Sequence, residues 1–290
     1  MSSETLLLAV GEIRDDYIHD AETAKKTMNW TRWLAAAACL CLMILAALPL
    51  LRGKGQQGTD APAQEINAFA FCGAYYEYTD VPAVLEKYGL PGTLTEAQLG
   101  QRIGFLERDG TTYRPCVEQT DAALYTYAPC PCPGVMILRD GEKLYGVLFC
   151  NHLLVSGACV EFLEIYRVYG VAGAADLASI RTYDGVFGHE KAGRPVTDPN
   201  ALAAFYEASL ALTPYGNDGF QAAEFGGEDE QTQTAHHQAL ADDEVTLRIE
   251  TASGLVFFIR AYPEHGWLEG DLSYYRVSDE MAAWLAEYLS

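Results

Sequence analysis

The chain is poor in basic residues. Its 290 residues include 19 Lys and Arg against 40 Asp and Glu, which gives a formal net charge of −21 at pH 7. A nucleic-acid-binding protein needs clusters of Lys and Arg to neutralise phosphates, so the composition excludes nucleic acid as a partner. A disordered acidic chain is excluded as well, because hydrophobic residues make up 50% of the sequence and can form a buried core.

The common catalytic and cofactor-binding motifs are also missing. The sequence contains no Gly-x-Ser-x-Gly, no phosphate-binding loop, no Rossmann glycine pattern and no His-Glu-x-x-His. We therefore predict that the protein is not an enzyme and has no catalytic residues, cofactor or metal. An alternative is a Cys–His nucleophile, since Cys150 and His152 would share a face if a strand continues through them.

One long apolar run stands out near the N-terminus. Residues 34–51 contain no charged side chain, and a helix of this length spans about 27 Å, close to the thickness of a bilayer core. Trp30 and Trp33 precede the run, where indole rings favour the membrane interface. We predict a single transmembrane helix that contacts the lipid bilayer; a buried core helix is the main alternative.

Basic residues on the two sides of this run indicate its orientation. Three lie shortly before it and two shortly after it, which slightly favours a cytoplasmic N-terminus. We therefore predict a single-pass protein of the cell membrane, with residues 1–33 in the cytoplasm and the C-terminal region outside. Residues 52–290 then carry most of the charge, with 34 acidic and 15 basic side chains.

The predicted cytoplasmic tail has an apolar stripe. Leu6, Val10, Ile13 and Tyr17 recur at steps of four and three, which predicts one face of an amphipathic helix. An isolated helix of this length is marginal in water. We therefore predict that these four residues bind a cytosolic protein; a plain spacer helix is the alternative.

The same tail resembles a known module. Residues 7–18 (LLAVGEIRDDYI), Lys25-Lys26, residues 30–33 and residues 37–42 (AACLCL) are similar to an N-terminal module of single-pass membrane proteins from clostridia and related Firmicutes. Some of these proteins look like anti-sigma-factor or sigma-regulator proteins. The resemblance implies an alternative sigma factor as the cytosolic partner. It implies no metal, because the Cys-x-x-Cys of zinc-binding anti-sigma proteins does not follow His19.

The region after the apolar run is predicted to have an α+β fold. Residues 52–65 indicate a flexible stalk, and residues 66–170 and 171–290 indicate two extracytoplasmic units of antiparallel sheet with helices on one face. The expected strands are 66–78, 104–107, 122–128, 135–139, 143–149, 178–183, 245–250, 255–262 and 272–277. The expected helices are 82–88, 95–103, 160–169, one that begins after Asp198 and one that begins after Ser278.

Residues 224–244 lack apolar periodicity. They belong to a stretch, 195–247, with ten acidic residues and no Lys or Arg. We predict a solvated loop here. The adjacent His236 and His237 could bind a transition metal beside the acidic residues, but two exposed rings are favoured. A Ca²⁺ site is the alternative because carboxylates are frequent, although the spacing of an EF-hand is missing.

The eight cysteines divide into two groups. Cys39 and Cys41 lie in the predicted membrane helix. The other six fall in the first outer unit and could form up to three disulfides or remain thiols; they are Cys72, Cys116, Cys130, Cys132, Cys150 and Cys159. The Cys130-Pro131-Cys132 segment could bind metal or exchange thiols, but a stiff turn whose thiols pack elsewhere is favoured.

These observations together predict a regulator with two binding regions. The outer region would bind or sense an unknown extracellular ligand, and the inner helix would contact the sigma factor. The alternatives are an anchored surface enzyme or thiol protein, and a structural module that binds the cell envelope.

Overall fold

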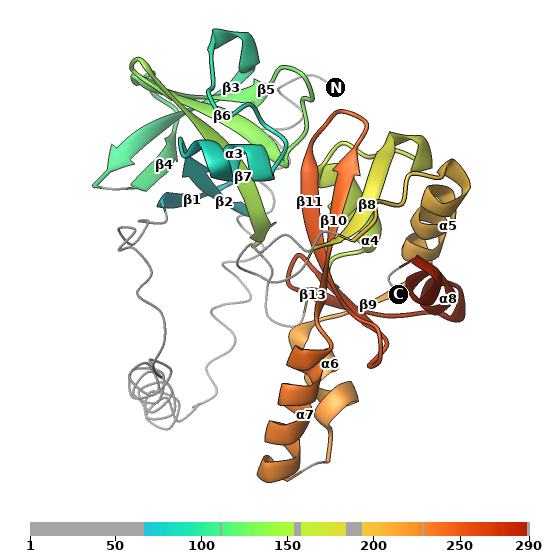
Figure 1. Ribbon diagram of the computed structural model, residues 1–290. Coiled ribbons are helices and arrows are strands. Elements are labelled where there is room, and N and C mark those ends of the chain that lie inside the picture. Colours follow the sequence, from blue (N-terminus) through green and yellow to red (C-terminus); the bar gives the residue numbers. More distant parts are fainter. Residues whose placement is uncertain (1–66, 111, 154–157, 184–192, 228, 289–290) are drawn as a thin grey trace, which may run out of the picture. The chain divides into compact units, whose positions relative to one another are not determined.

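The computed structural model describes residues 67–288, apart from residues 111, 154–157, 184–192 and 228 (Figure 1). The described residues belong to a compact unit that runs from residue 64 to residue 290. The predicted cytoplasmic tail (1–33), membrane helix (34–51) and stalk (52–65) lie outside the described residues. Within the described part, no helix combines the length and apolarity needed to cross a bilayer.

The first sheet has seven strands in the order β1-β2-β7-β6-β5-β3-β4, and all neighbouring pairs are antiparallel. The edge strands approach each other, with the rings of Phe69 and Tyr113 6.5 Å apart. The strands are β1 (Asn67–Phe71), β2 (Ala74–Thr79), β3 (Leu99–Asp109), β4 (Thr112–Cys116), β5 (Ala122–Tyr127), β6 (Val135–Asp140) and β7 (Lys143–His152).

Two short turns set the register of this sheet. The predicted strand 66–78 is in fact the β1–β2 hairpin, whose two-residue turn is Cys72-Gly73 with φ of +47° and +78°. Positive φ at both turn residues matches the twist of the flanking strands. The strands expected at 135–139 and 143–149 are confirmed, and Asp140-Gly141, a common hairpin-turn sequence, begins the turn between them: Asp140 pairs with Lys143 and Gly141 has a φ of +61°.

The second sheet has six strands in the order β8-β10-β11-β12-β13-β9, again with antiparallel neighbours. The strands expected at 245–250 and 255–262 are confirmed and pair as the β10–β11 hairpin, whose loop in the structure is residues 252–255. The short strands β9, β12 and the exact start of β13 were missed by the sequence analysis. The strands are β8 (Leu177–Tyr183), β9 (Thr213–Tyr215), β10 (Val245–Thr251), β11 (Val256–Tyr262), β12 (Trp267–Gly270) and β13 (Ser273–Arg276).

Six α-helices accompany the two sheets in the described part: α3 (Pro82–Lys87), α4 (Phe162–Val168), α5 (Pro199–Leu210), α6 (Asn217–Phe225), α7 (Glu230–Asp242) and α8 (Asp279–Tyr288). Two short 3₁₀ helices are η1 (Glu96–Gln98) and η2 (Ala174–Asp176). The predicted helix starts are confirmed: Asp198 accepts hydrogen bonds from two backbone N–H groups of α5, and Ser278 accepts one from Met281. The α+β class with antiparallel sheets is therefore confirmed.

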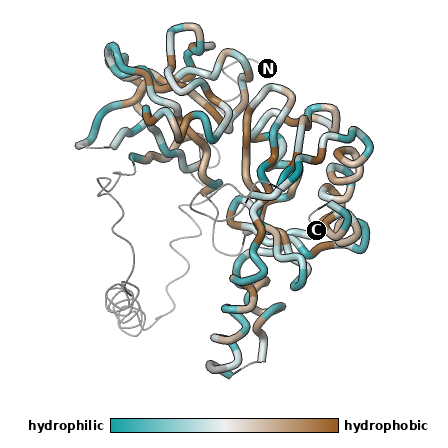
Figure 2. Tube along the Cα trace, viewed as in Figure 1, coloured by the Kyte–Doolittle hydropathy of each residue, from teal (hydrophilic) through white to brown (hydrophobic). Residues whose placement is uncertain are grey.

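The largest hydrophobic core contains side chains from both sheets. Tyr169, just after α4, stacks on Phe257 of β11 with ring centroids 4.6 Å apart. In the same core, Phe205 of α5 packs against Trp284 of α8, with ring centroids 4.8 Å apart. Hydrophobic residues follow the strands, and hydrophilic residues are concentrated in the turns (Figure 2).

The predicted helix 95–103 is wrong. The capping box at Thr95 and Gln98 is present, but it starts only the three-residue η1, and Leu99 already pairs with Tyr127 as part of β3. Gly100 weakens a helix at this point. As strand β3, this segment instead forms backbone hydrogen bonds with β5 and β4. A helix over the same residues could not form these hydrogen bonds.

The predicted loop 224–244 is also wrong. Its first two residues end α6, and residues 230–242 form α7 (Figure 1). Asp229 caps α7 by accepting a hydrogen bond from the Thr232 N–H at 2.9 Å. Among the side chains described on α7, only Leu240 is buried, which explains why no apolar repeat is visible in the sequence.

Candidate functional site

A cavity of about 410 Å³ lies between the end of α3 and the strands of the second sheet. Tyr88 forms part of its wall because the chain passes very close to the β10–β11 turn. Gly89 has a φ of +81°, and a Cβ there would lie 1.9 Å from the Gly254 carbonyl oxygen. Only glycine fits this approach, which lets the Tyr88 carbonyl accept a hydrogen bond from the Val256 N–H at 3.1 Å.

One wall of the pocket is aromatic. The Phe258 ring lies edge-to-face with Tyr88 at 5.7 Å and with Tyr183 at 5.8 Å. The Lys87 ammonium lies 5.0 Å from the Phe258 ring centroid, a cation–π arrangement. Burial raises the pKa of Tyr88 to about 12, so its hydroxyl is neutral at pH 7.

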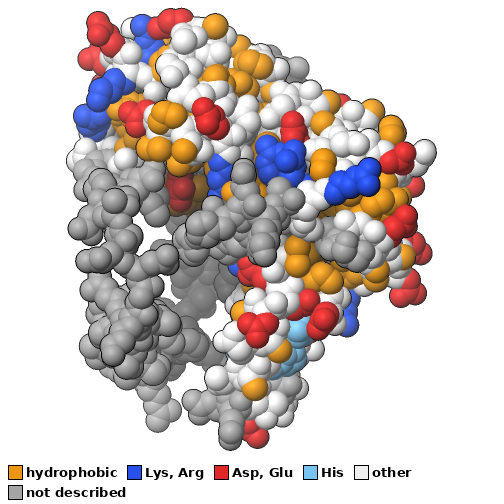
Figure 3. All heavy atoms as spheres, viewed as in Figure 1, with side chains coloured by type: hydrophobic (Ala, Val, Ile, Leu, Met, Phe, Trp, Pro, Cys, Tyr) orange, Lys and Arg blue, Asp and Glu red, His pale blue; other side chains and the backbone are white. Residues whose placement is uncertain are grey.

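The opposite side of the pocket carries both signs of charge. Arg260 forms an ion pair with Glu269, and the Tyr262 hydroxyl donates to Glu269 at 2.8 Å. Burial raises the pKa of Glu269, while Arg260 acts against that rise. A neighbouring hollow shares Lys87 and Phe258 and adds Arg181 and Arg248. Lys and Arg side chains also gather near the centre of the face in Figure 3.

A buried carboxylate and a histidine meet at the pocket rim. Asp271 accepts a hydrogen bond from the His152 N–H at 2.7 Å, and its second oxygen pairs with His152 Nδ1. Burial raises the pKa of Asp271, and the contacts with His152 oppose that rise. Asp271 and Leu272 form the two-residue turn of the β12–β13 hairpin, with φ of +49° and +58°, the geometry that matches the twist of the flanking strands.

The Cys–His nucleophile hypothesis can now be compared with the geometry. Cys150 lines the pocket together with Asp271, and Asp271 supplies a carboxylate for His152 that the sequence did not indicate. However, burial raises the pKa of Cys150 to about 12, with Glu77 adding to the rise. A nucleophilic thiol needs a lowered pKa, so the raised pKa of Cys150 gives this hypothesis no support.

The six cysteines of the predicted outer region are all free thiols in the structure. Cys72 and Cys159 are exposed, and Cys132 is buried. Burial, followed by the nearby Cys130 thiol, raises the pKa of Cys132 to about 12. Cys130 and Cys132 do come together at one turn, where the Cys132 N–H donates to the Cys130 carbonyl at 2.8 Å.

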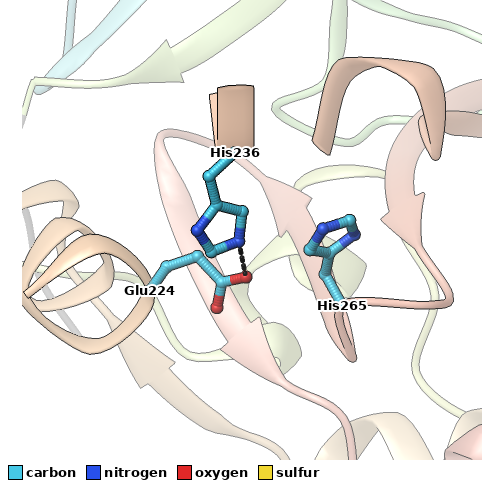
Figure 4. Close-up of side chains that lie close together, drawn as sticks. All are labelled: Glu224, His236 and His265. Carbon is cyan, nitrogen blue, oxygen red and sulfur yellow. Dashed lines mark hydrogen bonds and ion pairs between the residues drawn. The ribbon is translucent and has the colours of Figure 1, made fainter. Parts of the chain in front are cut away.

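A third group of polar side chains was missed because its segment was expected to be a loop. Glu224 of α6, His236 of α7 and His265 of the β11–β12 turn converge, and their potential ligand atoms lie within 4.8 Å of one another (Figure 4). Both histidines of the 236–237 pair were expected to be exposed. His237 is exposed, but His236 is half-buried. If residues 230–242 had been predicted as a helix, the inward position of His236 could have been inferred, because His236 and the apolar Leu240 are four residues apart and share one helix face.

The residues predicted to bind the cytosolic partner, Leu6, Val10, Ile13 and Tyr17, lie outside the described residues. With the fold and these sites in place, the chain was compared with known proteins. Comparisons with protein-family models, with curated proteins and with solved structures each gave no match.

Proposed function

We propose that residues 67–288 are the ligand-binding region of a single-pass membrane protein, and that the ligand occupies the pocket at Tyr88, Phe258 and Arg260. The observation that carries this proposal is the lining of the pocket, where the Tyr88 and Phe258 rings lie edge-to-face and the Lys87 ammonium lies 5.0 Å from the Phe258 ring centroid. A pocket of about 410 Å³ is also within the usual size for a small ligand.

The lining of the pocket indicates the chemistry of the ligand. The rings of Tyr88 and Phe258 fit a flat apolar group. The Lys87 ammonium lies over the Phe258 ring, and no carboxylate among the described side chains pairs with it. It is therefore available to an anion. The pocket best suits a small molecule with one anionic group and one apolar group.

The test is a thermal-shift screen of small carboxylates and phosphates on the full chain in detergent or nanodiscs. A ligand that stabilises the wild type should bind Lys87→Met about 10 to 100 times more weakly, because a hydrogen bond to a charged group contributes about 1.5–3 kcal/mol. Lys143→Met is the matched control, since Lys143 is exposed at the start of β7. Ligands that bind all three proteins equally, or a screen without any shift, would reject the pocket.

The predicted anchor and its orientation belong to the same proposal. Cys72 and Cys159 are exposed thiols, so a membrane-impermeant maleimide should label them on intact cells. The double variant Cys72→Ser, Cys159→Ser is the control for labelling at other thiols. Labelling that requires permeabilised cells would reverse the proposed orientation.

We also propose the two predicted outer units, 66–170 and 171–290, each with helices on one face of its sheet. The support is that the two sheets use separate stretches of the chain, 67–152 and 177–276. Because both sheets contribute to one hydrophobic core, the units would be structural halves.

The inner helix is proposed to contact a sigma factor, and a pull-down with residues 1–33 should lose that protein in a Val10→Asp, Ile13→Asp variant.

A further inference from the structure

We propose that Glu224, His236 and His265 bind a divalent transition metal of the Zn²⁺ class, with water at the remaining position. The three side chains come from α6, α7 and the β11–β12 turn and point toward one another in Figure 4. His236 Nε2 lies 3.2 Å from Glu224 Oε1. This site does not depend on the ligand pocket proposed above.

Asp243, at the end of α7, orients His265. One oxygen of Asp243 lies 3.0 Å from His265 Nδ1 and accepts the backbone N–H groups of Glu264 and His265 at 2.9 and 3.2 Å. The Asp243 side chain is only 10% exposed. Because Nδ1 is held by the carboxylate, Nε2 is the ring nitrogen left to ligate. A carboxylate behind a metal-binding histidine is the usual second-shell arrangement.

Trp267 orients Glu224 in the same way. The Trp267 indole N–H donates to Glu224 Oε2 at 2.6 Å, and the Arg276 guanidinium lies 3.8 Å from the same oxygen. The Glu224 side chain is 10% exposed. With Oε2 occupied, Oε1 is the oxygen that faces His236. Glu224 and His265 are therefore both held in place by hydrogen bonds before any ion binds.

The donor set selects the ion. Two imidazoles and one carboxylate suit Zn²⁺ and its neighbours in the first transition row, whereas Ca²⁺ and Mg²⁺ prefer oxygen donors alone. Zn²⁺ bonds of about 2.0–2.1 Å place tetrahedral ligand atoms about 3.3 Å apart. The His236–Glu224 distance of 3.2 Å already agrees with this spacing. Binding replaces the hydrogen bond between these two atoms with two bonds to the ion, which requires the neutral His236 ring to carry its proton on Nδ1.

The metal would link α7, which has few buried apolar side chains, to its neighbouring elements. Leu240 is the one buried side chain among those described on α7. An ion shared by His236, Glu224 and His265 would join α7 to α6 and to the β11–β12 turn. Metal binding should then protect the α7 backbone amides from hydrogen exchange, because an opening of α7 would break the coordination.

The test uses the full chain in nanodiscs, freed of metal with a chelator and titrated with Zn²⁺ against a chromophoric competitor. The wild type should bind one equivalent at this site, and its thermal midpoint should rise with Zn²⁺ concentration. His265→Ala and Glu224→Gln should each weaken binding by at least about 100-fold, since each removes one of three ligands. Gln238→Ala is the matched control, because Gln238 is exposed on the same helix and its side chain pairs with Asp242, so the affinity should stay unchanged.

Asp243→Asn separates positioning from ligation. It should lower Zn²⁺ affinity about 10- to 100-fold while the stoichiometry stays at one. Equal affinity in the wild type, His265→Ala and Glu224→Gln would overturn the proposal.

Thiols are also zinc ligands, and the described residues include six free ones. X-ray absorption of the wild type with one equivalent of Zn²⁺ therefore provides a measurement that needs no variant. Nitrogen and oxygen ligands at about 2.0–2.1 Å with imidazole scattering are expected, whereas a sulfur shell near 2.3 Å would assign the ion to cysteines and overturn the proposal.

Discussion

The α5–α8 pair and the α6–α7 pair differ in how much apolar surface their helices bury. Helix α5 buries Ala201, Leu202, Phe205 and Ser209, and α8 buries Met281, Trp284 and Leu285. Helix α7, which is no shorter, buries only Leu240 among its described side chains. Its other contacts combine the polar side chains of Glu224, His236 and Asp243 with the Phe225 ring, which stacks on His237 at 4.0 Å.

This difference predicts how the molecule opens. Burial of a large apolar side chain contributes about 1.5–3 kcal/mol, whereas a hydrogen bond contributes only about 0.5–1.5 kcal/mol net. Opening α7 therefore costs much less free energy than separating α5 from α8. We expect α7 to open locally while the two sheets stay folded, and α5 and α8 to open only on global unfolding.

The largest expected effect comes from breaking the apolar pair. Phe205 is 0% exposed and packs on Trp284, so Phe205→Ala should lower the free energy of unfolding by about 3–5 kcal/mol. Glu207→Ala on the exposed side of the same helix should change it by less than about 0.5 kcal/mol. Urea denaturation followed by circular dichroism measures both. A loss below 1 kcal/mol for Phe205→Ala would mean that α5 does not belong to the cooperative core.

Alkaline pH should lower the free energy of unfolding, because several thiols and phenols are buried in the hydrophobic cores. Cys132 and Cys150 have pKa values raised from 9.0 to about 12, and Tyr76 and Tyr88 have theirs raised from 10.0 to about 12, with burial the main cause in each case. These groups ionise more readily in the unfolded chain. Their contribution to stability is therefore complete below pH 9 and is lost as pH rises toward 12.

The measurement is the urea midpoint at pH 8, 9, 10 and 11. Between pH 9 and 11, the midpoint of Cys132→Ala should fall less steeply than that of the wild type, because one group that resists ionisation has been removed. At pH 8 the variant itself should be slightly less stable, since Cys132 is packed in the core with Val135 and Leu148. Parallel pH curves for the two proteins would contradict the assignment of Cys132.

Local signals made much of the fold predictable. The β6–β7 turn after Asp140, the caps at Asp198 and Ser278, and the β10–β11 hairpin each depend on a few consecutive residues, and each is present. The helix expected after Thr95 failed because pairing with β5 overrides a local cap. Helix α7 was missed because hydrophobic periodicity detects a helix only when the helix buries a stripe.

The sites were harder to predict because their partners are distant in the sequence. Asp271 contacts His152 across 119 positions, and the β11–β12 turn brings His265 to residues of α6 and α7. No spacing rule connects such residues before the sheets are known. The signs that were visible, the His236-His237 pair and the Cys150 and His152 spacing, pointed to the right segments but not to their partners.

The smallest expected effect separates the two helix pairs most directly, because it applies the same change to both. Asp198 caps α5 by accepting from Ala201 N at 2.9 Å, and Asp229 caps α7 by accepting from Thr232 N at the same distance. Loss of an Asp cap costs a helix about 1 kcal/mol. Asp198→Ala should therefore lower the global free energy of unfolding by about that amount, because α5 unfolds together with the core.

Asp229→Ala should leave global unfolding nearly unchanged and instead speed hydrogen exchange of the α7 amides by about fivefold, the factor that 1 kcal/mol gives for a local opening. Mass spectrometry of peptides over residues 230–242 measures this exchange, with peptides over residues 199–210 as the internal reference. If Asp229→Ala lowered the urea midpoint as much as Asp198→Ala, α7 would unfold with the core. The polar contacts of Glu224, His236 and Asp243 would then couple as strongly as the apolar ones.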